Sequence, residues 1–297
     1  MDWQTVIRHI ESATAQPFNL LKSQPLTGGD INKAYRLQAE NKSFFIKLNH
    51  PDRLPMFEAE ALGLLALAQS EAIRVPKVIV CGKTNDQAFL VLEYIALSQL
   101  NTHSEMLLGQ QLAQLHRHKQ PFFGWHTDNT IGSSSQVNGR YQDWITFWQQ
   151  QRLGQQLTLA ANNGYDGRLQ ILGEKLCAAI QPLFDGYQPQ PSLVHGDLWR
   201  GNVAADEQGN PVIYDPACYF GDRETDLAMT ELFGGFSPAF YQAYQAAYPL
   251  DPGYANRKPL YNLYHILNHL NLFGISYLHQ AEVMMHNIIL SITARVN

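Results

Sequence analysis

The most constraining feature of the sequence is the segment Val194–Asn202, together with the apolar run that follows it. Asp197 and Asn202 are five positions apart, and His195 stands two residues before Asp197. A strand-like run of apolar residues then ends at Asp215, thirteen residues after Asn202. A His-x-Asp sequence alone is compatible with an ordinary tight turn in which the Asp caps a helix. The added Asn, the strand and the second Asp, in this order, favour a catalytic loop.

These residue types are the ones that phosphoryl transfer requires. An enzyme that transfers a phosphoryl group must orient the attacking hydroxyl, hold Mg²⁺ against the phosphates and neutralise the charge of the transferring group. In kinases an Asp accepts the hydroxyl proton, and an Asn five residues later binds the metal together with a further Asp. We therefore predict that Asp197 is the base and that Asn202 and Asp215 bind Mg²⁺, since amide and carboxylate oxygens suit this ion.

A lysine that would hold the ATP phosphates is expected on an upstream strand. Lys47 is the only charged residue in the apolar run that surrounds it, so we expect its side chain to reach a cleft. The alternative is an exposed strand lysine. The helix that follows offers Glu58 and Glu60 as partners for Lys47. We favour Glu60 because apolar Leu64 and Leu67 stand four and seven positions later, on the same side of the helix.

Two further segments have the positions of nucleotide-binding elements. Gly28 and Gly29 precede the lysine strand, where a phosphate-covering loop is expected, although they do not match the G-x-G-x-x-G pattern. Backbone N–H groups at such glycines can approach phosphates. Glu93, Tyr94 and Ile95 follow the last predicted N-terminal strand, and we expect their backbone to contact adenine. The sequence thus predicts ATP and Mg²⁺ as cofactors.

The order of the predicted elements indicates an α+β fold with two lobes, of the protein-kinase type. Residues 1–95 are predicted to form a nucleotide-binding lobe with a small antiparallel sheet. Residues 96–297 are predicted to form a larger, mainly helical lobe that holds the catalytic and substrate-binding residues. The expected strands cover residues 34–38, 43–48, 78–80, 89–93 and 211–215. A first helix is expected near Trp3, and further helices are expected over residues 55–69, 104–115, 141–156 and 168–183, with Ser104 as the N-cap of the second of these. The rest of the chain is expected to be helical. Its buried stripe consists of Leu260, Leu263, Tyr264, Leu267, Leu270 and Leu278.

Composition and charge argue against several classes of protein. Hydrophobic residues make up 45% and charged residues 16% of the 297 residues, which is typical of a folded globular chain. The net charge of -5 disfavours nucleic-acid binding, which requires a concentrated basic surface. Three distant cysteines suit reduced thiols. We expect no signal peptide and no apolar run that crosses a bilayer, and hence a cytoplasmic protein that binds neither nucleic acid nor membranes.

Several segments carry a resemblance to a known family. They are His195–Asn202, Ile213–Ala217 and Gly221–Ala228, and the similarity extends to Met56–Glu60 and Phe233–Phe236. Together they resemble the fructosamine kinase (ketosamine-3-kinase) family, in the aminoglycoside-phosphotransferase-like branch of the protein-kinase fold. The resemblance implies an alcohol-group phosphotransferase that moves the γ-phosphoryl of ATP to the 3-hydroxyl of a sugar attached through an amine. Such an activity repairs glycated amines, so the implied substrate is a small-molecule or protein-bound ketosamine.

The resemblance also implies roles for residues beside the catalytic base. Asp226 would tie down the backbone of the catalytic loop, with capping of its own helix as the alternative, and His195 would have a structural role. Trp199 would stack on the sugar or its amine-bearing arm, or else pack the loop against the C-terminal lobe. Glu224 would add negative charge that suits a cationic acceptor, or else lie in a solvated turn. Arg200 departs from the serine that is expected in this family.

Other interpretations stay open at this stage. The same catalytic loop occurs in kinases of aminoglycosides, choline and sugars, which differ in the acceptor pocket. A nucleotide-binding pseudokinase is disfavoured because Lys47, Asp197, Asn202 and Asp215 are all present. A protein kinase is disfavoured because no A-P-E-like segment follows Asp215. The sequence leaves the natural amine and the oligomeric state open, and we expect a monomer.

One pair of histidines on a predicted helix has the spacing of metal ligands. His265 and His269 are four positions apart, so their side chains would share one face. A zinc motif on a helix would have a glutamate between the two histidines and a third ligand elsewhere, and the sequence offers neither. We therefore expect a packed or surface pair.

Overall fold

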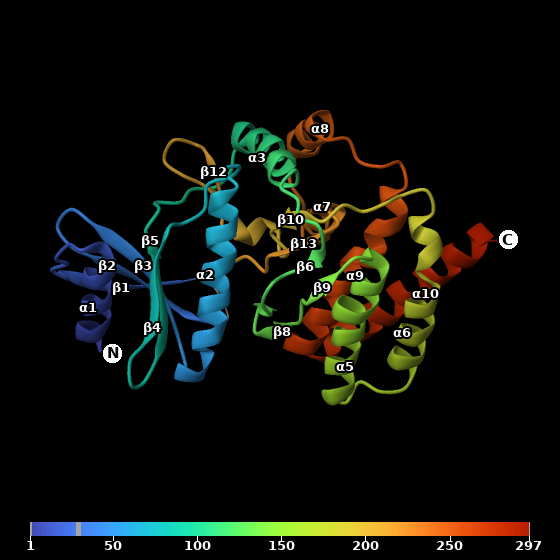
Figure 1. Cartoon of the computed structure of the whole chain (residues 1–297), viewed down its shortest axis with the longest axis horizontal. Coiled ribbons are helices and arrows are strands. Elements are labelled where there is room, and N and C mark those ends of the chain that lie inside the picture. The colour runs from blue at the N-terminus through green and yellow to red at the C-terminus, as the bar shows by residue number, and fades with distance from the viewer. Residues whose placement is uncertain (1, 28–30, 297) are drawn as a thin grey trace.

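The computed structural model describes residues 2–27 and 31–296, which form a small strand-rich part and a larger, mainly helical part (Figure 1). The strand-rich part lies at the left of Figure 1 and the last helices at the right. The predicted α+β, kinase-like architecture is confirmed. The N-terminal elements are α1 (Trp3–Thr14), β1 (Lys22–Leu26), β2 (Lys33–Gln38), β3 (Ser43–Asn49), α2 (Leu54–Gln69), β4 (Val78–Lys83) and β5 (Ala88–Glu93).

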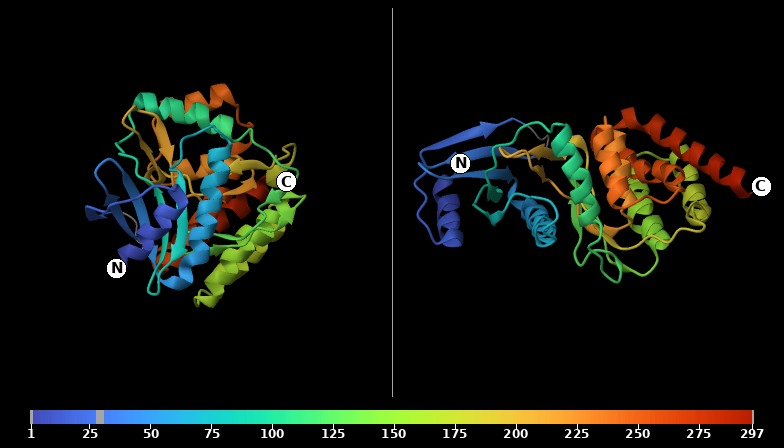
Figure 2. Two further views of the ribbon diagram at one scale, coloured as in Figure 1. Left: turned by 60° about the vertical axis from the view of Figure 1, so that its left-hand side comes forward. Right: turned by 90° about the horizontal axis from the view of Figure 1, so that it is seen from above.

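The N-terminal strands form one antiparallel sheet in the order β1-β2-β3-β5-β4. Alternate side chains of β3 point to opposite faces. Phe44, Ile46 and Leu48 are buried in a core cluster with residues of α1, whereas Lys47 reaches α2 on the other face. In Figures 1 and 2, α2 lies between the sheet and the helical part. The predicted alternation thus directs the lysine towards the junction of the two parts.

Strand β1 is absent from the expectations drawn from the sequence. Its residues Lys22–Leu26 include Pro25, which pairs with Tyr35 of β2. Proline lacks an N–H group and is tolerated in a sheet only where that donor is not needed, as on an edge strand. Since β1 is the outermost strand of the sheet, its proline is compatible with pairing on one side. A local pattern that contains a proline does not predict such a strand.

Among the described residues of the C-terminal part, the helices surround one four-stranded sheet and two two-stranded hairpins. Strands β10, β13, β6 and β9 form one sheet in that order, while β11 pairs with β12 and β7 pairs with β8. The elements are α3 (Thr102–Leu115), β6 (Phe123–Gly124), β7 (Asn129–Ile131), β8 (Ser134–Gln136), β9 (Arg140–Tyr141), α4 (Trp144–Phe147), α5 (Gln155–Asn162), α6 (Arg168–Ala179), β10 (Ser192–Val194), β11 (Val203–Ala205), β12 (Pro211–Ile213), β13 (Tyr219–Gly221), α7 (Glu224–Leu232), α8 (Pro238–Ala247), α9 (Tyr254–Phe273) and α10 (Leu278–Val296).

Some predicted helix boundaries are wrong. Asn101, not Ser104, is the N-cap of α3, and Ser104 completes a capping box as the third helical residue. The helix expected over residues 141–156 begins at Trp144 and passes through a π-helical stretch at 148–154 before α5. The helix expected over 168–183 ends at residue 179, before a short 3-10 turn. Leu278 begins α10 and is only partly buried, so it does not extend the stripe on α9.

The connection between the two parts lies after β5, close to the boundary predicted at residue 95. The hydrophobic packing does not separate there. Leu90, Leu92 and the inner face of α2 belong to the same core cluster as the C-terminal helices. An added Cβ on Gly63 of α2 would touch Pro216 and Cys218. The two parts therefore share one hydrophobic core, and the division into lobes of residues 1–95 and 96–297 stays a prediction.

The cysteines and helices bear on two expectations about the environment of the chain. Cys81, Cys177 and Cys218 all lie in the described residues and none is in a disulfide. Burial raises the pKa of each thiol, so these side chains favour the protonated form. Across residues 2–27 and 31–296, no helix combines the length and the apolar character that a membrane crossing needs.

Candidate active site

The catalytic loop connects β10 to β11 and is held in shape by its own polar groups. Asn202 donates from Nδ2 to the backbone carbonyl of Asp197 at 2.9 Å and to Oδ2 of the same residue at 3.2 Å. Gly196 has a φ of +83°, and an added Cβ would overlap the carbonyl oxygen of Ala217. Only glycine fits at this position without displacing the chain. The loop is thereby bent so that Asp197 and Asn202 face each other.

Asp226 of α7 holds the backbone of this loop through hydrogen bonds. Its carboxylate accepts hydrogen bonds from the backbone N–H of His195 at 2.7 Å and of Gly196 at 2.9 Å. The third contact is His116 of α3, whose Nε2 lies 3.2 Å from Oδ2. Burial alone would raise the pKa of Asp226, but these partners hold it below its usual value. The contacts match the predicted anchoring role, and the capping alternative lacks a side-chain cap bond in α7. His116 is a member of this cluster that the sequence did not indicate.

His195 is buried and binds the strand that precedes the second Asp. Its Nε2 lies 3.0 Å from the carbonyl oxygen of Tyr214, and its Nδ1 lies 3.3 Å from the backbone nitrogen of Asp197. Burial lowers the pKa of His195, so the ring is neutral near pH 7. The side chain thus connects the catalytic loop to the residue before Asp215, which is compatible with the structural role predicted for His195.

Asp197 stands in an environment that disfavours its charge. Burial, followed by repulsion from Asp215, raises its pKa to about 7, although the hydrogen bond from Asn202 opposes this shift. The side chain still exposes 22% of its surface, so it borders open space. A carboxylate whose pKa lies near neutral pH matches the requirement for a general base.

Lys47 forms an ion-paired triad with two carboxylates from distant parts of the chain. Its Nζ lies 2.7 Å from Oε1 of Glu60 and 2.5 Å from Oδ1 of Asp215. Burial would lower the pKa of Lys47, but both carboxylates raise it well above its usual value, so the lysine is charged. Glu58 is exposed on another side of α2. Of the two glutamates considered from the sequence, Glu60 is the one that contacts Lys47.

Asp215 and Asn202 provide the oxygen atoms that a magnesium ion would need. Asp215 follows β12 with a φ of +56°, which turns its half-exposed side chain out of the strand direction. Oδ1 of this carboxylate contacts Lys47, which leaves Oδ2 for a cation. Nδ2 of Asn202 is engaged by Asp197, so Oδ1 is the amide atom that remains. Two hard oxygen donors beside the catalytic Asp fit Mg²⁺.

The nucleotide side of the site is described only in part. Gly28 and Gly29 lie outside the described residues. The Glu93 side chain binds away from the connection, with its carboxylate 2.9 Å from Arg74 Nη2 and 3.2 Å from the backbone nitrogen of Lys77. Its expected contact with adenine would therefore involve its backbone only. A contact made by the backbone does not require a particular side chain, so the sequence carries no specific signal for it.

The other two residues of the connection lie at the end of the sheet. The guanidinium of Arg36 in β2 lies 4.2 Å from the centre of the Tyr94 ring, a cation–π contact. Tyr94 and Ile95 follow β5 directly. The adenine contact expected for their backbone stays a prediction.

Two ring side chains close to Asp197, those of Trp199 and His265, come from different elements. Trp199 is 39% exposed, and its ring covers Gly201, where an added Cβ would overlap it. Nδ1 of His265 in α9 lies 4.0 Å from Oδ1 of Asp197. One turn later, His269 packs against Phe233 with ring centres 4.7 Å apart. The helical spacing of the histidines is visible in the sequence, but only the fold shows that His265 faces the catalytic Asp.

Glu224 does not line the acceptor side. It is fully buried in α7, and both carboxylate oxygens accept from Arg257 of α9, at 2.7 and 2.9 Å. Burial, followed by repulsion from Asp222, raises its pKa to about 7. The expected contact with a cationic substrate is therefore wrong in this structure, and so is the alternative of a solvated turn. The local sequence is rich in acids, but it carries no sign of the distant arginine that buries this one.

Comparisons with known proteins agree with this geometry. The family model described as "Fructosamine kinase" matches residues 2–291. A "Probable ketoamine kinase" of Synechocystis sp. is 47% identical over 95% of both chains. Another, from Vibrio parahaemolyticus serotype O3:K6, is 43% identical over 97% of this chain and 99% of its own. The crystal structure of a candidate fructosamine-3-kinase from Haemophilus somnus 129PT has a TM-score of 0.88 at 29% identity, covering 96% of this chain and 97% of that one.

More distant structures share the fold alone. The choline kinase LicA of Streptococcus pneumoniae superposes with a TM-score of 0.67 at 15% identity, covering 98% of this chain and 100% of its own. The aminoglycoside phosphotransferase APH(4)-Ia superposes with a TM-score of 0.61 at 14% identity, covering 97% and 99%. These similarities define the fold, whereas the family model and the two close relatives cover nearly the whole sequence. The chain therefore belongs to the fructosamine kinase family.

Proposed function

We propose that this chain is an ATP-dependent kinase that phosphorylates the 3-hydroxyl group of ketosamines. The observation that carries the proposal is the arrangement of Asp197, Asn202, Asp215 and Lys47 in one site. Each of these residues has the chemistry that phosphoryl transfer requires. Family membership supports the choice of acceptor, since two close relatives bear the name ketoamine kinase.

The geometry suggests how the acceptor hydroxyl is held. Oδ1 of Asp197 and Nδ1 of His265 are 4.0 Å apart, which is too far for a direct hydrogen bond. A hydroxyl oxygen placed between them could reach both atoms at ordinary hydrogen-bond distances. Asp197 would accept the hydroxyl proton while the oxygen attacks the γ-phosphorus, and His265, which is neutral because burial lowers its pKa to about 3, would orient that oxygen.

The remaining residues act on the phosphate side. Bound at Asn202 and Asp215, Mg²⁺ would neutralise charge on the ATP phosphates. Lys47 would hold the phosphates, and its contact with Glu60 keeps the ammonium at the cleft. The oxygen–phosphorus bond to ADP breaks as the new bond to the sugar oxygen forms. The product is a ketosamine 3-phosphate, which the resemblance implies to be unstable, so the reaction would serve to remove sugars from amines.

The experiment is an assay of ATP consumption with fructosyl-amines, aminoglycosides and choline as acceptors. We expect turnover with fructosyl-amines and transfer of phosphate to the 3-hydroxyl, which phosphorus and proton NMR of the product would locate. Asp197→Asn is the matched control and should abolish turnover. Turnover of aminoglycosides or choline alone would exclude the ketosamine assignment. Nucleotide binding without turnover of any acceptor would favour a pseudokinase.

A further inference from the structure

Arg200, at which the catalytic loop departs from the expected serine, connects three parts of the helical lobe. Its Nη1 atom donates to Oε1 of Glu105 in α3 at 2.9 Å and to the carbonyl oxygen of Gly235 at 3.3 Å. Its guanidinium lies 5.7 Å from the centre of the Phe236 ring. One side chain thus joins the catalytic loop and α3 to the segment Phe233–Ser237, which we call the glycine loop.

Glu105 makes this connection firm because its carboxylate is buried and has defined partners. The residue is 3% exposed, and a buried carboxylate is costly unless it is paired. Its second oxygen, Oε2, accepts from the backbone nitrogen of Ser237 at 2.6 Å, where a negative charge is favourable at the N-terminus of α8. Helix α3 also packs closely on α8, since a Cβ on Gly109 would overlap the carbonyl of Phe240.

The glycine loop reaches the acceptor side of the site through its first residue. The Phe233 ring lies 4.7 Å from that of His269 in α9. His265, one turn earlier in the same helix, faces Asp197 across 4.0 Å. Phe233 therefore packs on the face of α9 that also carries His265, one turn away from the residue beside Asp197.

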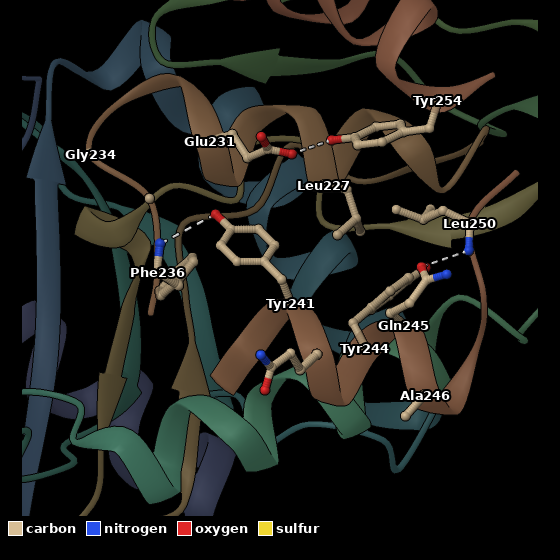
Figure 3. Close-up of a pocket in the computed structure, with 12 residues that line it drawn as sticks. Leu227, Glu231, Gly234, Phe236, Tyr241, Tyr244, Gln245, Ala246, Leu250 and Tyr254 are labelled. Carbon is tan, nitrogen blue, oxygen red and sulfur yellow. Dashed lines mark hydrogen bonds between the residues drawn. The ribbon is translucent and has the colours of Figure 1, made fainter. Parts of the chain in front are cut away.

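The other side of the glycine loop borders a cavity of about 940 Å³ between α7, α8 and the start of α9 (Figure 3). Gly234 and Gly235 line it and have φ angles of +92° and +69°, a conformation that glycine adopts without strain. In Figure 3 the Tyr241 hydroxyl points to the backbone nitrogen of Phe236, 3.3 Å away. The loop thus has open space on one side and conformationally permissive residues, so a restraint is needed to keep it at the acceptor side.

We propose that Arg200 is a positioning residue that holds the glycine loop, and with it Phe233, in the place that acceptor binding requires. The proposal rests on the proposed function and adds a determinant of acceptor affinity to it. Arg200 bonds to Glu105 and Gly235, and neither contacts the Lys47–Glu60–Asp215 triad, so its effect falls on the acceptor and not on ATP.

The kinetic test compares Arg200→Ser with Arg168→Ser. Arg168 is exposed and lies 3.7 Å from Glu282 of α10. Arg168→Ser is therefore a matched control, because it also removes an arginine that forms an ion pair. We expect Arg200→Ser to raise KM for a fructosyl-amine by about tenfold while KM for ATP stays within about twofold. Arg200→Lys, which keeps the charge, should recover part of the acceptor affinity. Equal increases in both constants, or no change in either, would overturn the proposal.

A double-mutant cycle tests whether Arg200 acts through Glu105. Arg200→Ser and Glu105→Gln should each raise the acceptor KM, and the double variant should be no worse than the more affected single variant, because the two side chains act as one unit. Full additivity of the two effects would show that Arg200 acts on the acceptor by another route, and would contradict the proposal.

A measurement without substrate separates this proposal from the proposed function. Hydrogen exchange of the peptide that contains residues 233–237 should become about tenfold faster in Arg200→Ser, since the loop loses its restraint. The same peptide should be unchanged in Arg168→Ser. Unchanged exchange in Arg200→Ser would overturn the restraint whichever acceptor the enzyme uses. Lack of turnover by the unaltered protein with every fructosyl-amine would instead contradict the proposed function.

Discussion

The ammonium group of Lys47 lies 2.5 Å from Oδ1 of Asp215, although 168 positions separate the two residues in the chain. Lys47 comes from the sheet, and Asp215 follows a strand of the helical part. Glu60 of α2 binds the same ammonium at 2.7 Å. The contact therefore joins the residue proposed to hold the phosphates to one proposed to bind the metal, across the junction of the two parts.

Replacement of Lys47 should separate the catalytic role of this triad from its structural role. We expect Lys47→Met to reduce kcat by at least about 100-fold and to lower the free energy of unfolding by about 3 kcal/mol, because the Glu60 carboxylate loses its partner. The double variant Lys47→Met/Glu60→Gln should regain much of the stability, measured by urea unfolding, and none of the turnover. Recovery of turnover in the double variant would contradict a role for Lys47 in phosphate binding.

Asp226→Asn should loosen the catalytic loop. An amide can accept only with its oxygen, so one of the two backbone N–H groups of His195 and Gly196 would face an N–H donor. We expect a loss of about 2 kcal/mol in the free energy of unfolding together with a lower kcat. Asp166→Asn, at an exposed position, is the control and should leave both unchanged. Wild-type kcat in Asp226→Asn would show that the loop does not depend on this anchor.

Three buried histidines resist protonation, so their contribution to stability should fall in acid, whereas carboxyls with raised pKa values, such as Asp197 and Glu224, act in the opposite direction. Burial lowers the pKa of His116 and His195, and it lowers that of His265 to about 3. Between pH 6.5 and pH 3 the unfolded chain binds a proton at His265 and the folded chain does not, so the stability that His265 contributes is full above about pH 6.5 and declines as the pH falls. For His265 alone the loss reaches about 2 kcal/mol at pH 5.

His265→Gln tests this contribution. The free energy of unfolding, measured with urea at several pH values, should depend less steeply on pH between 6.5 and 5 in the variant, by up to one proton. The remaining slope would come from other groups, including His116 and His195. An unchanged slope would mean that His265 titrates alike in the folded and unfolded chains, which contradicts the lowering of its pKa by burial.

Glu224→Gln distinguishes the buried ion pair from a substrate contact. The variant removes the charge of one of the two carboxylates that pair with Arg257, the other being Asp251, so we expect a lower unfolding midpoint temperature. The KM for a fructosyl-amine should not change, because Glu224 is fully buried and does not line the acceptor side. An increase in KM at unchanged stability would restore the substrate role that the sequence suggested.

Local spacing in the sequence determined the parts of the site that lie close together in the chain. Asp197 and Asn202 face each other because a short turn between two strands permits little else, and Gly196 provides the required φ. The alternation around Lys47 likewise determined which face of β3 carries the lysine. The periodicity of α2 pointed to Glu60 for the same reason, since three- and four-residue spacing defines one helical face.

Only the tertiary structure decided which distant groups meet, because packing selects contacts that no local pattern encodes. It placed His265 opposite Asp197, joined Arg200 to Glu105, and buried Glu224 against Arg257. The outer position of β1 likewise accommodates Pro25, which its local sequence does not predict. The sequence by itself thus determined the catalytic chemistry, through residue types at fixed short spacing. The fold determined the surroundings of Asp197, because His265 of α9 and the glycine loop beside that helix come near it only when the chain packs.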